Sequence, residues 1–280
     1  MTVLRDAADF AVIAEVNPPE LPTMTHLQLE GGWARVLVTD NPFGTIRVSP
    51  YAYAARITHD VPGVKPTVVV STHDRNIRAI ESEVRGALGN GVRSFLVVVG
   101  DTVPEIDHLA HHHEIVEHLT ALRDRIDDDF EVGMPTRMRT WQYRQRVDLG
   151  ADFFVAGPVI DPATVEENLG RIERKPDDPP IYVMVVPPVS LGWVQKAEGY
   201  GAVPVTDSMR ADLVARPGRG WAWDQAALAV EALDRAGCSG AVLTGLRFET
   251  VVGEAAEWRR RLVGGDSTLG HGSEPVDQSA

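Results

Sequence analysis

The chain has 280 residues, of which 44% are hydrophobic and 24% charged, as in an ordinary soluble globular protein. Its formal net charge of −13 argues against nucleic acid or an anionic membrane surface as the main partner, but it does not exclude an anionic small molecule. The single cysteine, Cys238, excludes an intramolecular disulfide and a cysteine-rich metal site.

Eight short apolar segments, most of them rich in β-branched residues, recur along the chain. They lack the alternation of a half-exposed strand, which is typical of a parallel sheet that helices cover. The predicted strands are Phe10–Val16, Arg35–Asp40, Thr67–Thr72, Ser94–Val99, Phe130–Pro135, Asp152–Val159, Ile181–Val186 and Gly240–Gly245.

A helical segment is expected after each strand. In Ile77–Leu88, for example, apolar residues recur at helical spacing before a Gly-Asn-Gly stop. One further helical stretch is expected between the first and second strands. The other predicted helices are Pro50–Ile57, about Glu105–Arg125, Thr140–Leu149, Pro162–Ile172, about Trp223–Ala236 and about Glu249–Val263. After the seventh strand, a loop with Leu191, Gly192 and Trp193 leads to short helices.

This order of elements predicts an α/β fold, a single (β/α)8 TIM barrel over residues 1–263. A doubly wound open sheet is the alternative, but no Gly-x-Gly-x-x-Gly follows an early strand. Residues 264–280 are polar and Gly/Ser-rich, and we expect a disordered tail there.

Two acids, Glu15 and Asp101, fall at the carboxyl ends of the first and fourth strands. In a barrel these ends converge on one mouth, so both acids are expected to face a shared pocket. Acids in such a place suit proton donation and stabilisation of a cationic intermediate, and burial there would raise a carboxyl pKa. Other residues at strand ends are Thr39, Thr72, Met134, Gly157 and Thr244.

A histidine cluster in the helix of about Glu105–Arg125 invites a metal interpretation, and His108 and His112 have i, i+4 spacing. No glutamate stands between these two residues in the zinc-protease arrangement, and the segment is polar on several sides. We therefore expect a solvated helix face and no metal. The full cluster is His108, His111, His112, His113 and His118.

The first residues lack a signal-peptide pattern, and no apolar run approaches the ~20 residues that span a bilayer. We therefore expect a cytoplasmic protein with neither nucleic acid nor membrane as a partner. A homo-oligomer is compatible with the sequence.

Short matches along roughly Phe10–Trp258 resemble the methylenetetrahydrofolate reductase family. Ala14–Pro19 is similar to the family's first-strand acid and paired prolines, and Thr72–Asn76 is similar to a Thr-Arg-Asp-Arg-Asn motif of one branch. Further matches are Val38–Asp40 with Gly44, Gly91–Asp101, Gly150–Phe153 and Pro188–Ser190.

The resemblance implies that 5,10-methylenetetrahydrofolate opens to a 5-iminium cation, which accepts a hydride and becomes 5-methyltetrahydrofolate. Glu15 would protonate the folate nitrogen during ring opening, and Asp101 would stabilise the iminium charge. The resemblance also implies cofactor contacts from Thr39, Thr72, Met134 and Arg146, and substrate contacts from Gly157, Leu191 and Trp193.

Several positions depart from the family pattern. Val99 replaces an arginine that contacts flavin phosphate, Val69 replaces a histidine that contacts flavin, and Gly157 replaces a glutamine that holds the pterin. FAD is therefore doubtful, and direct hydride transfer from NAD(P)H to folate is open. Replacement positive charge for phosphate or folate glutamate groups could come from Arg137, Arg139, Arg144 and Arg146.

Two alternatives to such a reductase are considered. One is a related pterin enzyme of a methyl-transfer pathway, with altered substrate recognition at Gly157. The other is a non-catalytic pterin-binding protein, although a binding module has no need of a proton donor such as Glu15.

Overall fold

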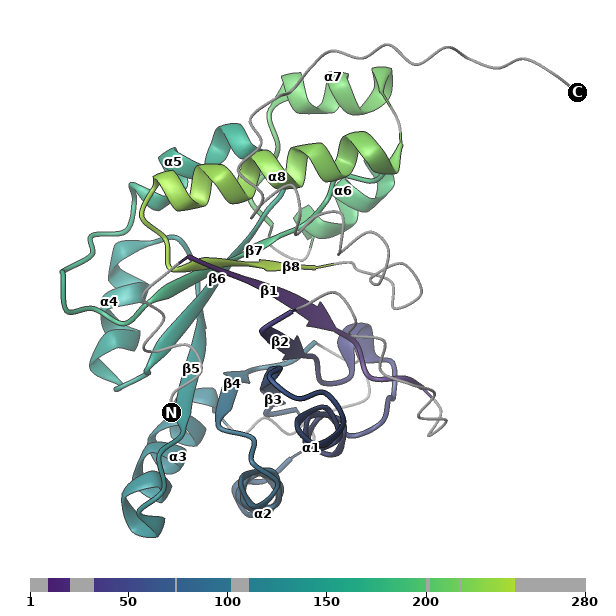
Figure 1. Ribbon diagram of the computed structural model, residues 1–280. Coiled ribbons are helices and arrows are strands. Elements are labelled where there is room, and N and C mark those ends of the chain that lie inside the picture. The colour runs from purple at the N-terminus through teal and green to yellow at the C-terminus, as the bar shows by residue number, and fades with distance from the viewer. Residues whose placement is uncertain are drawn as a thin grey trace, which may run out of the picture.

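The computed structural model describes residues 10–20, 33–73, 75–101, 111–199, 202–216 and 218–244. Within these residues, eight parallel strands close into a barrel in chain order, with helices on its outside (Figure 1). The predicted (β/α)8 barrel is thereby confirmed. Its strands are β1 Ala11–Val16, β2 Arg35–Val38, β3 Lys65–Ser71, β4 Ser94–Val98, β5 Glu131–Thr136, β6 Phe153–Val159, β7 Ile181–Val185 and β8 Gly240–Leu243.

The described helices follow the strands as expected. They are α1 Pro50–Asp60, α2 Ile77–Gly89, α3 His112–Ile126, α4 Thr140–Asp148, α5 Val165–Leu169, α6 Leu191–Gly199, α7 Asp207–Ala215 and α8 Arg219–Arg235, with single 3₁₀ turns at Pro42–Gly44 and Pro162–Thr164. Four predicted parts of the chain lie wholly or largely outside the described residues: the helical stretch after the first strand, the beginning of the helix over about Glu105–Arg125, the helix over about Glu249–Val263 and the tail from Gly264.

Four of the described helices differ from the predictions. Helix α1 continues three residues beyond the predicted Ile57, to Asp60. Leu191–Trp193 is the first turn of α6 and not a loop, because the Ser190 hydroxyl accepts a hydrogen bond from the Trp193 N–H at 3.1 Å. The Pro162–Ile172 segment divides into a 3₁₀ turn, which Asp161 caps, and the short α5. Helix α8 begins four residues before the predicted Trp223.

Alternation along the strands divides the apolar side chains into an inner and an outer core. The inner core contains Ile13, Leu37, Val69, Leu96, Phe153, Val155, Tyr182 and Val242. Gly133 leaves space for the Phe153 ring of this core, because a Cβ at position 133 would lie 2.3 Å from that ring. The outer core fills the space between the sheet and the helices.

A third apolar cluster lies under α6 and α7. It consists of Ile160, Val186, Val194, Ala197, Ala202, Val205, Met209 and Leu213. Asp161 ties this cluster to the end of β6, because its carboxylate accepts hydrogen bonds from the Thr206 N–H at 3.0 Å and the Thr206 hydroxyl at 2.6 Å. Helices α6 and α7, with this cluster beneath them, thus extend the fold at the carboxyl ends of β6 and β7.

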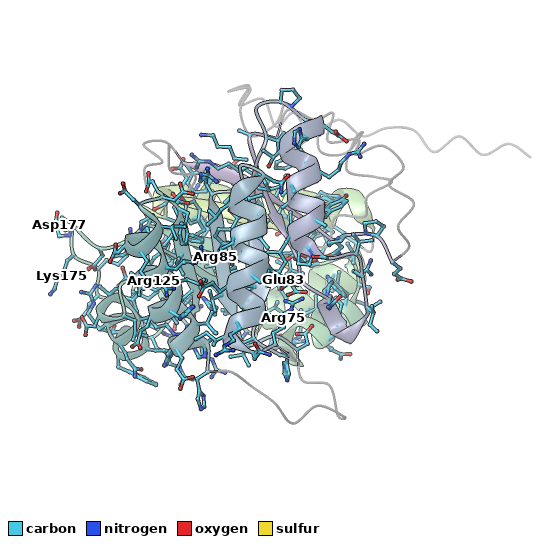
Figure 2. All side chains as sticks on the ribbon, turned by 90° about the horizontal axis from the view of Figure 1, so that it is seen from below. Arg75, Glu83, Arg85, Arg125, Lys175 and Asp177 are labelled. Atoms are coloured by element: carbon cyan, nitrogen blue, oxygen red, sulfur yellow. The ribbon has the colours of Figure 1, made fainter. Side chains whose placement is uncertain are left out.

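Charged side chains join neighbouring helices on the outer surface. Glu81 on α2 accepts from Arg85 of its own helix at 2.7 Å and from Arg125 on α3 at 3.2 Å; Figure 2 shows both arginines. None of the helices that the described residues form is long and apolar enough to cross a lipid bilayer.

Candidate functional site

Glu15 lies on the inner face of β1, near the mouth of the barrel. Ile13 belongs to the inner core and Ala11 packs against it. Side chains alternate along a strand, so Glu15 lies on the same face as these two residues, two positions closer to the mouth than Ile13. Its neighbour in register on β2 is Leu37, another inner-core residue. The side chain is partly buried. The predicted position of this acid therefore agrees with the strand geometry.

Asp101 follows β4 and connects to the turn after β2. Gly100, with φ of 92°, brings the chain so close to β3 that a Cβ would lie 2.2 Å from the Ser71 hydroxyl oxygen. The exposed Asp101 carboxylate accepts a hydrogen bond from the Phe43 N–H at 2.5 Å. The predicted second acid thus stands at the mouth and also holds a loop.

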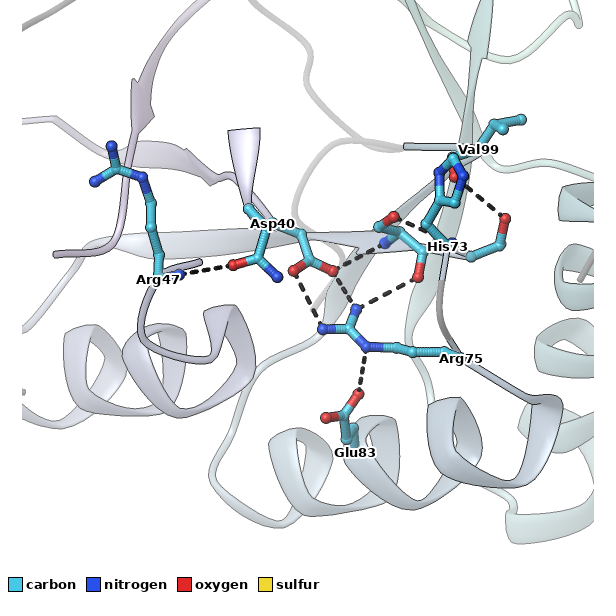
Figure 3. Close-up of polar contacts among 9 residues, drawn as sticks. Asp40, Arg47, His73, Arg75, Glu83 and Val99 are labelled. Atoms are coloured by element: carbon cyan, nitrogen blue, oxygen red, sulfur yellow. Dashed lines mark hydrogen bonds and ion pairs between the residues drawn. The ribbon is translucent and has the colours of Figure 1, made fainter. Parts of the chain in front are cut away.

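A buried ion pair fixes the ends of β2 and β3. The Asp40 side chain is fully buried, and both of its oxygens accept hydrogen bonds from the Arg75 guanidinium (Figure 3). Asp40 also accepts from the Ser71 N–H at 3.1 Å, and Arg75 lies 3.5 Å from the Glu83 carboxylate. The pKa of Arg75 is raised above its usual value. Burial lowers this pKa, but the hydrogen bond to Asp40 and the charge of Asp40 raise it by more.

The two predicted threonines use their hydroxyls within the protein. The Thr39 hydroxyl donates to Asn17 Oδ1 at 2.7 Å, on the loop after β1. Thr72 is fully buried, and its hydroxyl donates to the Val99 carbonyl at 3.4 Å. Met134 is fully buried in the outer core. This placement corrects the expectation that Met134 reaches the mouth, because its side chain packs between the sheet and the helices.

His73, directly after β3, is a candidate site residue that sequence reasoning did not select. Its ring lies beside Gly100, where an added Cβ would be 3.2 Å from Nδ1, and Figure 3 shows it next to Val99. Among the described residues, this shielded nitrogen has no hydrogen-bond partner.

Basic side chains gather beside the carboxyl end of β5. Arg146, on the last turn of α4, is 9% exposed and donates to the Pro135 carbonyl, and no carboxylate of the described residues pairs with it. Burial and the charge of Arg137 lower its pKa. His112, at the start of α3, has a pKa lowered to about 4, first by burial and then by neighbouring positive charges that include Arg146. We call Arg137, Arg146, His112 and His113 the basic cluster.

The other predicted arginine and histidine contacts are structural or solvated. Arg144 pairs with Asp178 before β7, and His118 lies 2.5 Å from the Glu81 carboxylate. His108 lies outside the described residues. In the part of the chain that the structure describes, no group of three His, Cys, Asp or Glu side chains could hold a metal ion.

The predicted substrate residues come from β6 and α6. Gly157 has φ of 103°, and a Cβ there would lie 3.1 Å from the Met184 carbonyl oxygen, so a larger residue would be strained. Leu191 is 37% exposed on the first turn of α6. The Lys196 ammonium lies 5.9 Å from the centre of the Trp193 ring and 4.6 Å from that of Phe43. Helix α6 and the turn after β2 therefore meet.

No protein-family model and no curated protein matches the chain. Solved structures share its fold. An uncharacterized protein from Clostridium thermocellum that binds two copies of 5-methyl-5,6,7,8-tetrahydrofolic acid matches with a TM-score of 0.62 and 10% identity, over 92% of this chain and 97% of its own. A 2,3-dimethylmalate lyase matches with a TM-score of 0.54 and 14% identity, over 94% and 85%. An oxaloacetate acetylhydrolase in complex with oxalate matches with 0.51 and 12%, over 93% and 85%.

Proposed function

We propose that the barrel mouth binds a reduced folate and that the protein reduces 5,10-methylenetetrahydrofolate to 5-methyltetrahydrofolate. The observation that carries this proposal is Glu15, a carboxyl on the inner face of an otherwise apolar strand at the mouth. The Clostridium thermocellum protein, which has the same barrel and binds a methylated folate, supports a folate over other ligands.

Each acid has a distinct role in this reaction. Glu15 gives a proton to the folate nitrogen that leaves the bridging carbon, so the five-membered ring opens and an iminium cation remains at the other nitrogen. Asp101 supplies a fixed negative charge at the same mouth, which favours that cation. The carbon then takes up a hydride, so substrate, proton and hydride together give the methyl product.

The hydride donor in this proposal is NAD(P)H, which supplies its hydride directly to the folate. Arg137 and Arg146 of the basic cluster suit the phosphates of such a dinucleotide, because both carry a positive charge and Arg146 is buried with no carboxylate partner among the described residues. Val99 and Val69 are apolar and offer no charge to a flavin, so FAD has no part in the proposed reaction. Here Arg146 keeps its predicted cofactor role.

The test is NAD(P)H oxidation with 5,10-methylenetetrahydrofolate, using protein stripped of flavin, with and without added FAD. Turnover without FAD is the expected result. Turnover only with FAD would keep the reductase and overturn the direct transfer. Absence of turnover under both conditions would overturn the reductase proposal.

A second candidate is a protein that binds 5-methyltetrahydrofolate without catalysis. It is favoured by the Clostridium thermocellum protein, whose described property is folate binding. Calorimetric titration with 5-methyltetrahydrofolate separates the two candidates when combined with the oxidation assay. Binding without any NAD(P)H oxidation would select the second candidate, whereas binding with turnover would select the first.

A further inference from the structure

The turn after β2 has an unfavourable backbone that exposes an aromatic ring. Asn41 and Phe43 have φ of 46° and 59°, in the left-handed region that side chains disfavour. Phe43 belongs to none of the three apolar clusters and is 52% exposed. Burial of the ring therefore does not explain the strain, which points to a role at the surface.

The turn is held in this shape by polar contacts at both of its ends. Asp101, 58 residues further along the chain, accepts the hydrogen bond from the Phe43 N–H. The Asn41 side chain accepts one from the Arg47 N–H at 2.8 Å (Figure 3). The Phe43 ring is thus positioned by a residue of the proposed site.

A cation from α6 meets this ring. The Lys196 ammonium lies 4.6 Å from the ring centre, within the range of a cation–π contact. Such a contact leaves the positive charge of the ammonium in place. An exposed aromatic ring and an exposed cation therefore stand together where α6 meets the turn after β2.

Exposed apolar side chains gather on the same side of the barrel. Ile46, Val99, Val189 and Leu191 are between 37% and 84% exposed, and they lie in or beside the segments that follow β2, β4 and β7. Exposed apolar groups close to one another are typical of a binding surface. A ligand with a flat apolar part and an acidic part would match this combination.

We infer that Phe43 and Lys196 form a subsite for the aminobenzoyl-glutamate part of the folate. Phe43 packs against the aminobenzoyl ring, and Lys196 pairs with a glutamate carboxylate. This inference rests on the proposed folate binding and adds the residues that distinguish a folate from a free pterin. The protein's net charge of −13 makes a local cation necessary for an anionic ligand.

The experiment is calorimetric titration of the full chain with two probes, 5-methyltetrahydrofolate and 6-methyltetrahydropterin, which has no aminobenzoyl-glutamate. The variants are Lys196→Gln and Phe43→Leu. The matched control is Lys175→Gln, the same change of charge in the exposed loop before β7, at the opposite end of the strands, where Figure 2 shows the side chain pointing away from the barrel.

The expected result is that Lys196→Gln and Phe43→Leu each weaken folate binding about three- to tenfold, while pterin binding stays within about twofold of the unaltered protein. Lys175→Gln should bind both probes as the unaltered protein does. Unchanged folate binding in both test variants would overturn the subsite alone. Equal weakening for both probes would also overturn it, because the effect would then lie at the pterin. An unaltered protein that binds neither probe would overturn the proposed function as well.

Discussion

Asp40→Asn should destabilise the protein strongly, because it removes the charge that compensates a largely buried guanidinium. The Asp40 side chain is fully buried, and that of its partner Arg75 is 18% exposed. Removing one member of a buried pair typically costs 3–5 kcal/mol, and the amide can still accept from the Ser71 N–H. We therefore expect a loss of about 3 kcal/mol in the free energy of unfolding, or roughly 6–12 °C in melting temperature.

The assay is urea unfolding followed by circular dichroism, with Asp60→Asn as the control. Asp60 pairs with Arg56 on α1, but these side chains are 41% and 53% exposed, so the same change should cost less than about 1 kcal/mol. Adding Arg75→Gln to Asp40→Asn should recover part of the loss, since the unpaired cation is then gone. A loss for Asp40→Asn as small as that for Asp60→Asn would refute the reasoning.

Four further results are expected. Glu15→Gln should lower the turnover of the proposed reduction by at least about 100-fold and leave folate affinity within a few-fold; unchanged turnover would remove Glu15 as the acid. Asp101→Asn keeps an oxygen acceptor for the turn but loses the charge, so single-turnover hydride transfer should slow, and a normal rate would contradict the electrostatic role. Because the pKa of His112 is lowered to about 4, its neutral form stabilises the fold above pH 6.5 and this stabilisation is lost as the pH falls from 6.5 to 4; melting curves of His112→Gln should lack that component. Gly133→Ala should cost about 1–3 kcal/mol through its clash with the aromatic ring it faces, whereas Gly86→Ala on α2, with open space around it, should be neutral or stabilising in urea unfolding.

The barrel could be predicted from the sequence because its strands are continuous apolar runs between clear stops. Ser94–Val98 is such a run, and Gly100 and Asp101 end it. The face of the sheet on which a side chain lies was harder to predict, because these strands do not alternate between polar and apolar residues. In β5 the inner face carries Gly133, whose space the Phe153 ring of β6 fills, so the sequence alone did not indicate that Met134 faces outward.

Of the site residues, only those that lie on a strand could be predicted from the sequence. Glu15 could be found because an acid interrupts an apolar strand at its end. Phe43 could not, because the shape of its turn depends on Asp101, and Lys196 meets it only after α6 has packed against the barrel. The burial of Arg146 likewise results from tertiary packing and has no local signal.

The separate apolar cluster under α6 and α7 has a consequence for local stability. A unit with its own small core can open without the barrel unfolding, and such units exchange their amide hydrogens earlier than the strands do. Asp161 sets the boundary of that unit through its two hydrogen bonds to Thr206. Because Lys196 and Trp193 belong to α6, a ligand that binds them would slow the opening of the whole unit, and amide exchange in α7 would then report occupancy of the mouth.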